Sequence, residues 1–138
     1  MLMAGSTNAF GQITFEQMLQ HPLVPAVREI LRKENPIIER VAVLEVKSRS
    51  ATGPHVVIGW GIRPDRRFSG SFRDELFGIF LANTELTKID RVLELIPSPR
   101  WADYEFHVER ITSEQVTIVG KGSTYGDGPI RRVYRLER

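Results

Sequence analysis

Apolar positions in the first quarter of the chain recur at helical spacing. Over residues 25–34 they return at intervals of three and four, with charged residues between them. This pattern is typical of an amphipathic helix that buries one face, and Pro25 suits its first turn. We expect the helix to pack on the protein's own sheet rather than on a membrane surface. Its apolar face is formed by Val24, Val27, Ile30 and Leu31.

A shorter helix is predicted just before it, over residues 15–20. Thr14 stands three residues before Gln17, which is the spacing of a capping box. In that arrangement each side chain accepts a hydrogen bond from the other residue's backbone N–H. Pro22 ends this helix, because proline disfavours helical geometry at the preceding residue and has no N–H to donate.

From Ile38 onward the pattern changes to short β-branched runs separated by turn residues. In residues 104–111 apolar and polar positions alternate, as expected for a strand with one buried face. Residues 88–96 fit a helix and a strand alike, and we interpret them as a strand. The predicted strands cover residues 38–47, 55–62, 76–82, 88–96, 104–111, 115–120 and 130–136.

Seven short strands in succession predict a mainly β fold, or an α+β fold if the helix fills the mouth of the sheet. We expect an antiparallel meander in a barrel-like or strongly curved sheet, covered by the N-terminal helical segment. The length of 138 residues is that of a typical single domain, so residues 13–138 are assigned to one β-rich domain. No stretch approaches the roughly 20 apolar residues that a membrane-spanning helix requires.

Residues 1–12 are treated as a separate N-terminal tail. Thr7 and Ala9 are small residues at the positions that precede a signal-peptidase cut, which is typical of the end of a secretory signal. The charged start and long apolar core of such a signal are missing from this segment. Two interpretations stay open. The segment is the remnant of a signal peptide on a periplasmic or secreted protein, or it is the tail of a cytoplasmic one.

The charge balance and the absence of cysteine argue against several classes of function. The 19 Lys and Arg residues against 17 Asp and Glu leave a net charge of +2, which is not the footprint of a nucleic-acid-binding protein. Because the chain has no Cys, it forms no disulfide and has neither a thiolate nucleophile nor a cysteine zinc site. No cofactor fingerprint is recognisable, so we expect no cofactor and no metal.

One strand carries a row of titratable residues. Glu105, His107 and Glu109 alternate with apolar residues and therefore share one face of the strand over residues 104–111. Such a row supplies the elements of acid–base catalysis, with His107 as the group that changes charge nearest to neutral pH. A solvated sheet face accounts for the same alternation. His55 would join this row only if the fold brought its strand to the same face.

Cationic residues are a second candidate site, for an anionic ligand. One pair lies in the loop over residues 63–71 and another on the last strand, and a lysine lies in the glycine-rich stretch over residues 120–128. Neighbouring arginines on a strand point to opposite faces, so one of the last pair should point inward and need a carboxylate partner or a bound anion. The candidate residues are Arg66, Arg67, Lys121, Arg131 and Arg132.

Two classes of function remain. The favoured one is a non-enzymatic binding or accessory protein, which presents a surface or a small cavity to a protein partner or a ligand. Aromatic residues such as Trp60 and Tyr134 would line such a cavity or fill the core. The alternative is a small enzyme that uses the Glu105, His107 and Glu109 row. The shape of the sheet decides between ligand binding in an open cavity and recognition by the surface of a filled core.

Overall fold

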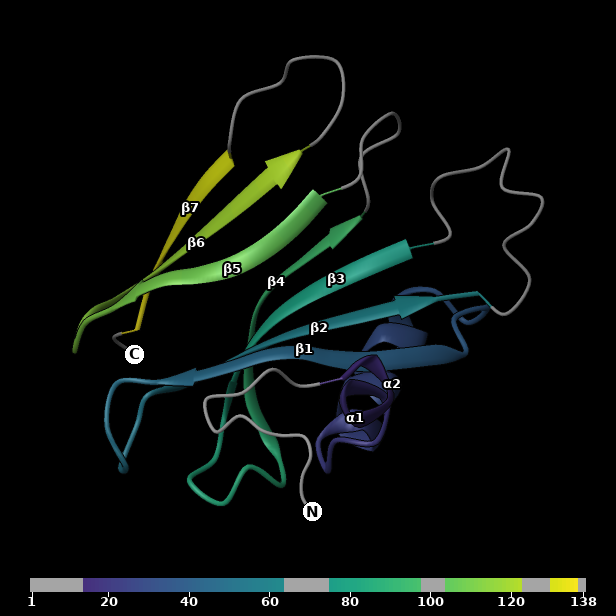
Figure 1. Ribbon diagram of the computed structural model, residues 1–138, viewed down its shortest axis with the longest axis horizontal. Helices are drawn as coiled ribbons and strands as arrows, with labels where there is room; N and C mark the ends of the chain where they lie inside the picture. Colours follow the sequence, from purple (N-terminus) through teal and green to yellow (C-terminus); the bar gives the residue numbers. More distant parts are fainter. Residues whose placement is uncertain (1–13, 64–74, 98–103, 123–129, 137–138) are drawn as a thin grey trace.

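The computed structural model describes residues 14–63, 75–97, 104–122 and 130–136 (Figure 1). In these ranges seven strands form two antiparallel sheets, preceded by two short helices. The four-stranded sheet has the order β1 (Arg40–Ser48), β2 (His55–Ile62), β3 (Glu75–Ala82) and β4 (Ile89–Pro97). The three-stranded sheet has the order β5 (Tyr104–Ile111), β6 (Gln115–Gly122) and β7 (Ile130–Arg135).

The mainly β class and the succession of antiparallel strands are confirmed. β2 and β5 have the predicted bounds, and the ambiguous segment over residues 88–96 is indeed a strand, β4. All strand neighbours within each sheet are also consecutive in the chain. Among the described residues neither helix is long and apolar enough to cross a membrane.

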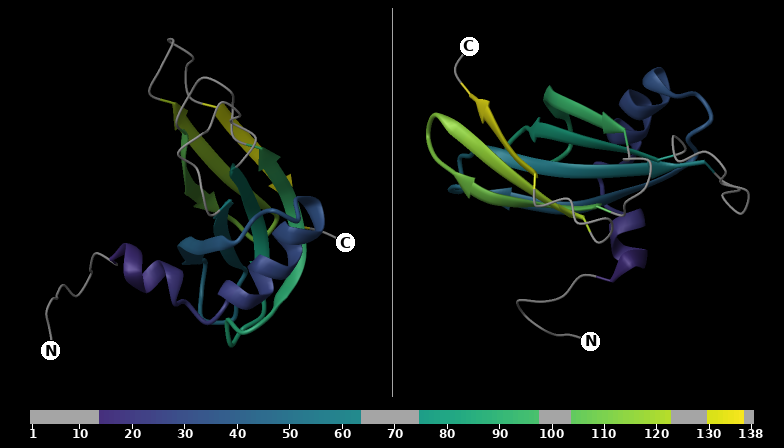
Figure 2. Two further views of the ribbon diagram at one scale, coloured as in Figure 1. Left: turned by 90° about the vertical axis from the view of Figure 1, so that its right-hand side faces the viewer. Right: turned by 90° about the horizontal axis from the view of Figure 1, so that it is seen from above.

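The barrel-like sheet is not confirmed, because the meander is interrupted between β4 and β5. These two strands are not hydrogen-bonded to each other, and the two sheets are separate units (Figures 1 and 2). β5 instead contacts β1 and β2, while Arg91 on β4 donates hydrogen bonds to backbone carbonyls at the end of β7. The sheets stay separate because β2 and β3 are buried on both faces. The four-stranded sheet therefore needs a covering layer on each side.

The three-stranded sheet covers one face of the four-stranded sheet. Phe77 and Phe106 meet edge to face across the two sheets, with ring centroids 4.9 Å apart. The rest of this inter-sheet core consists of buried aliphatic side chains from both sheets, which hold the sheets together by hydrophobic burial. They are Val56, Ile58, Ile79, Ile96, Val108, Val116 and Ile118.

The helix α2 (Val24–Glu34) covers the other face of the four-stranded sheet, so the predicted packing is confirmed. Its residues Val24, Val27 and Leu31 are buried, whereas Ile30 is only partly buried. Glycine lets the helix approach β2 closely. A Cβ on Gly59 would lie 2.8 Å from Val27 Cγ1, so a larger residue there would push α2 off the sheet.

The helix α1 (Phe15–Leu19) begins with the predicted capping box. The backbone N–H of Gln17 donates to Thr14 Oγ1 at 3.1 Å, and the N–H of Thr14 donates to Gln17 Oε1 at 2.9 Å. None of its residues is buried, and it lies against β1 (Figure 1). α1 is therefore a small cover beside the sheets, whereas α2 belongs to the core.

Candidate functional site

A pocket of about 430 Å³ opens where α1 and β1 face β5. Five elements contribute to its lining, which is mostly apolar: α1, β1, β2, β3 and β5. Its volume falls in the range of sites for small organic ligands. The apolar lining residues are Phe15, Met18, Leu44, Trp60, Phe77 and Phe106, and the polar ones are Glu45, Glu75, Glu105 and His107.

The pocket lies where two edge strands meet without forming a backbone ladder. The pairing of β1 with β2 shifts register between Val43 and Glu45, and that of β5 with β6 shifts between Val108 and Arg110. Such bulges bend a strand and increase its twist. The carboxylate of Glu45 accepts a hydrogen bond from the backbone N–H of Val108 at 3.1 Å. A side chain thus joins the two edges at a point where a closed barrel would have a ladder.

The aromatic wall of the pocket is held by polar and ring contacts. Trp60 Nε1 donates to Glu75 Oε2 at 2.8 Å, which ties the indole of β2 to β3. The ring of Phe15 meets Trp60 edge to face at 5.9 Å between centroids. The guanidinium of Arg40 lies over the Phe15 ring, with Cζ 5.5 Å from the ring centroid. These contacts fix the Trp60 ring before any ligand arrives.

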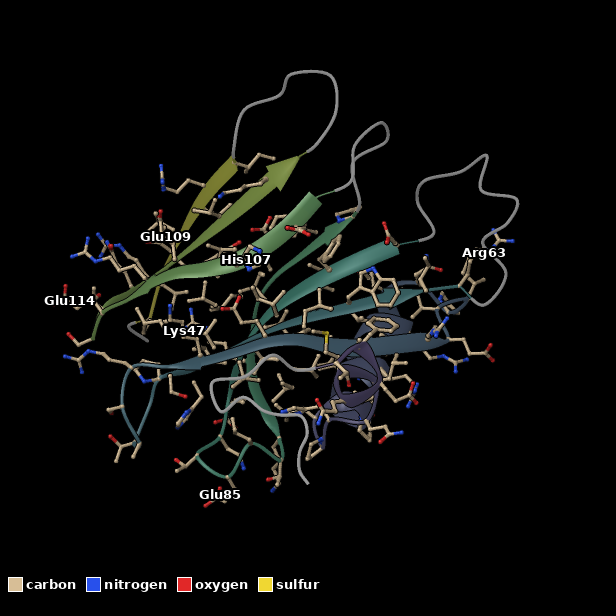
Figure 3. The ribbon with its side chains drawn as sticks, viewed as in Figure 1. Lys47, Arg63, Glu85, His107, Glu109 and Glu114 are labelled. Carbon is tan, nitrogen blue, oxygen red and sulfur yellow. The ribbon has the colours of Figure 1, made fainter. Side chains whose placement is uncertain are left out.

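Two residues of the predicted acid–base row, Glu105 and His107, line this pocket. His107 lies between two carboxylates, with Nδ1 3.6 Å from Glu45 Oε1 and Nε2 3.7 Å from Glu105 Oε1. Its side chain is 58% exposed and that of Glu105 is 81% exposed, so both stand at the rim. Figure 3 shows His107 on the middle of β5 and Glu109 farther along the same strand.

Glu109, the third residue of the predicted row, is not among the residues that line the pocket. Glu109 is exposed like Glu105 and His107, and the pairing of β5 with β6 shifts register around it, between Val108 and Arg110. Its carboxylate accepts two hydrogen bonds from Arg131, from Nε and Nη2, both at 3.0 Å. The sequence pattern could not show the register shift, because a bulge depends on the partner strand.

The hydrogen bond from Arg131 lowers the pKa of Glu109 below its ordinary value. We therefore expect a carbon-detected NMR titration to give Glu109 a midpoint below that of an ordinary glutamate, and Arg131→Met to raise it. A folded-state pKa below the unfolded-state value means that the pair contributes stability above the unfolded-state pKa. This contribution is lost as the pH falls through the folded-state pKa. An identical midpoint in wild type and Arg131→Met would contradict the assignment.

Of the three predicted cationic residues that the structure describes, Lys121 and Arg131 share the outer face of the three-stranded sheet and Arg132 lies on the inner face. Lys121 is exposed on β6, and Arg131 and Arg132 belong to opposite faces of the three-stranded sheet. Arg132 is the one of the last pair that points inward, and it has the first of the two expected partners, a carboxylate: its Nη1 donates to Glu94 Oε2 on β4 at 2.9 Å. Arg66 and Arg67 lie outside the described residues, so an anion site that includes them stays a prediction.

The same carboxylate also accepts a hydrogen bond from the hydroxyl of Tyr134, at 2.5 Å. Burial, followed by this hydrogen bond, raises the pKa of Tyr134. Glu94 thus links β4 to two residues of β7 on the side of the molecule away from β1. Because the side chains of Glu94 and Arg132 are partly solvated, we regard this group as an inter-sheet tie of modest strength.

His55 does not join His107. It is buried at the start of β2, where its ring pairs with Ser48 Oγ at 2.5 Å from Nδ1. It lines neither the pocket nor the rim around His107. In the parts of the chain that the structure describes, no three His, Asp or Glu side chains are placed to hold a metal ion.

Three residues of the pocket, Glu45, Glu75 and Phe15, were not predicted as site residues from the sequence. A signal was present for the two glutamates: Glu45 interrupts an apolar run, and Glu75 precedes another. A charge within an apolar strand requires a partner, and these two have Val108 N–H and Trp60 Nε1.

Comparison with protein-family models, with curated proteins and with solved structures found no match to the chain.

Proposed function

We propose that this protein is a non-enzymatic binding protein that takes a small, largely apolar ligand into the pocket between its sheets. The observation that carries this proposal is the composition of the pocket lining, in which aromatic and aliphatic side chains make the walls and a few polar groups stand near the rim. This is the usual composition of a small-molecule site. The volume of about 430 Å³ suits one such ligand.

The Trp60 wall supports binding because it is organised before the ligand enters. Its indole N–H is already satisfied by Glu75, and its ring packs edge to face with that of Phe15. A ligand that buries apolar surface on such a wall gains hydrophobic free energy without the cost of ordering the ring. Phe15 and Met18 come from α1, which has no buried residues, so this side of the pocket is not part of the core.

The alternative, a small enzyme, is favoured by one observation: His107 stands at the rim within 3.7 Å of two carboxylates. A histidine with a neighbouring carboxylate is able to accept and return a proton. In that case His107→Gln would abolish turnover of a bound compound. A binding protein would keep its affinity in the same variant.

A fluorescent probe tests the binding proposal. N-phenyl-1-naphthylamine is a neutral, apolar dye whose emission rises on leaving water, and we expect it to bind the wild-type protein saturably. Met18→Trp fills the pocket from α1 and should weaken dye binding at least about tenfold, or about 1.4 kcal/mol. The matched control is Val133→Trp, which adds the same side chain at an exposed position of β7.

Circular dichroism and thermal melts of both variants establish that they are folded before their affinities are compared. Equal dye affinity in Met18→Trp and Val133→Trp would show that the dye binds elsewhere. The same would hold for a signal that does not saturate. Either result would overturn the proposal for this pocket.

A further inference from the structure

We propose that the natural ligand carries a positive charge, as an organic ammonium or guanidinium group attached to an apolar or aromatic body. This inference rests on the proposed function, since it assigns the chemistry of the ligand to the same pocket. Its basis is the convergence of carboxylates on an aromatic wall.

The charge of the pocket lining is opposite to that of the chain. Three carboxylates line it, Glu45, Glu75 and Glu105, and none of its lining residues is Lys or Arg. The whole chain has a net charge of +2. The three residues come from β1, β3 and β5, so their convergence is a product of the fold and not of a local acidic stretch. An anionic ligand would be repelled here, whereas a cationic one would be attracted.

Glu75 is the carboxylate best placed to hold the cation. The rim carboxylates of Glu45 and Glu105 share His107, which lies within 3.7 Å of both. Glu75 stands instead beside the indole of Trp60, which donates to Oε2. This hydrogen bond orients the carboxylate, and it uses one of the two oxygens. Beside an apolar wall the attraction between a carboxylate and a cation is stronger than in open water.

The rings of the pocket favour the same ligand. The face of an aromatic ring attracts a cation, and tryptophan does so most strongly. One such contact is present in the protein: Arg40 Cζ lies 5.5 Å from the centroid of the Phe15 ring. Arg40 is not a lining residue, so it leaves the interior of the pocket to the ligand. Trp60 lines the same pocket as Glu75, so a cation held in the pocket would have both a carboxylate and aromatic rings around it.

Three probes with one apolar body test this inference by isothermal titration calorimetry at pH 7.5. They are 1-naphthylmethylammonium, the neutral 1-naphthylmethanol and the anionic 1-naphthoate. We expect the ammonium to bind the wild-type protein at least about tenfold more tightly than the alcohol, and the carboxylate to bind most weakly. Glu75→Gln should remove the preference for the ammonium and leave the affinity for the alcohol unchanged.

The variant Glu75→Gln is chosen because the amide oxygen of glutamine still accepts the hydrogen bond from Trp60 Nε1, so the aromatic wall is kept. Glu114→Gln is the matched control, since Glu114 is exposed and is not a lining residue. The preference for the ammonium should be the same in this control as in wild type. Thermal melts of both variants show whether the fold is intact.

The possible failures are distinguishable. Equal affinities for the ammonium and the alcohol in wild type would overturn the charge assignment and leave the proposed binding function standing. A preference that survives Glu75→Gln would overturn the role of Glu75. No binding of any probe, N-phenyl-1-naphthylamine included, would overturn both proposals. So would a dimer in sedimentation that Met18→Trp dissociates, because the pocket would then be a contact between two copies of the chain.

Discussion

Leu31→Ala is expected to lower the free energy of unfolding by about 3 kcal/mol, as measured by urea melts. Leu31 is fully buried on α2, where it packs against the four-stranded sheet. A Cβ on Gly61 would lie 2.9 Å from its Cδ1, which shows how closely the helix is seated. The truncation leaves a cavity that the sheet is poorly able to fill, because β2 is held by β1 on one side and β3 on the other.

Two controls on the same helix make the result specific. Ile30→Ala removes a partly buried side chain and should cost less, about 1 kcal/mol. Arg32→Ala, at an exposed position, should stay within about 0.5 kcal/mol of wild type. If the midpoint of Leu31→Ala matched that of Arg32→Ala, α2 would not belong to the core. Its apolar face would then be a docking surface for a partner.

The second large effect concerns Phe80 and the glycines beneath its ring. Gly59 and Gly78 are direct cross-strand partners in β2 and β3, and neither has a side chain to cover the sheet. The ring of Phe80 fills this space: a Cβ on Gly78 would lie 2.6 Å from Phe80 Cε2, and one on Gly59 would lie 3.0 Å from the same atom. An aromatic ring laid over glycines in this way restores lost packing in a sheet. We expect Phe80→Ala to cost about 4 kcal/mol.

A double-mutant cycle tests the placement of the ring. Gly78→Ala alone should cost about 2 kcal/mol, because the added methyl group collides with a buried ring that has little room to move. In the Phe80→Ala background the same change should cost much less, since the ring is gone. The two changes are therefore expected to be less destabilising together than their sum, by about 1–2 kcal/mol in urea melts. Strict additivity would show that the ring does not lie over Gly78.

Local features of the fold were predictable from the sequence because their causes are local. The alternation in residues 104–111 fixed both ends of β5, and the spacing of Thr14 and Gln17 predicted the cap of α1. Strand geometry also predicted that one of Arg131 and Arg132 points inward and needs a carboxylate or a bound anion, and Arg132 is the one that does. Its partner, Glu94, is 38 residues away in the chain, and no local pattern could name it.

Features that depend on two distant segments were not predictable. Residues Val57, Gly59 and Gly61 of β2 lie under α2, and the alternation of β2 alone could not show which element covers this face. Which of Ile30 and Leu31 is more deeply buried depends on where the helix lies over the glycines. The site was predicted only in part. Glu105 and His107 line the pocket, but Glu109 is not among its lining residues.

The carboxylate of Glu45 has a consequence for the behaviour of the protein at high concentration. Edge strands carry unpaired N–H and C=O groups, which are templates for strands of other molecules and so for aggregation. β1 and β5 are both edges of their sheets, and each has a bulge where they meet. Glu45 occupies the N–H of Val108 and places a charge beside it, so a foreign strand cannot pair with β5 there without displacing it. The carboxylate that joins the two sheet edges therefore also protects the opening between them from other chains.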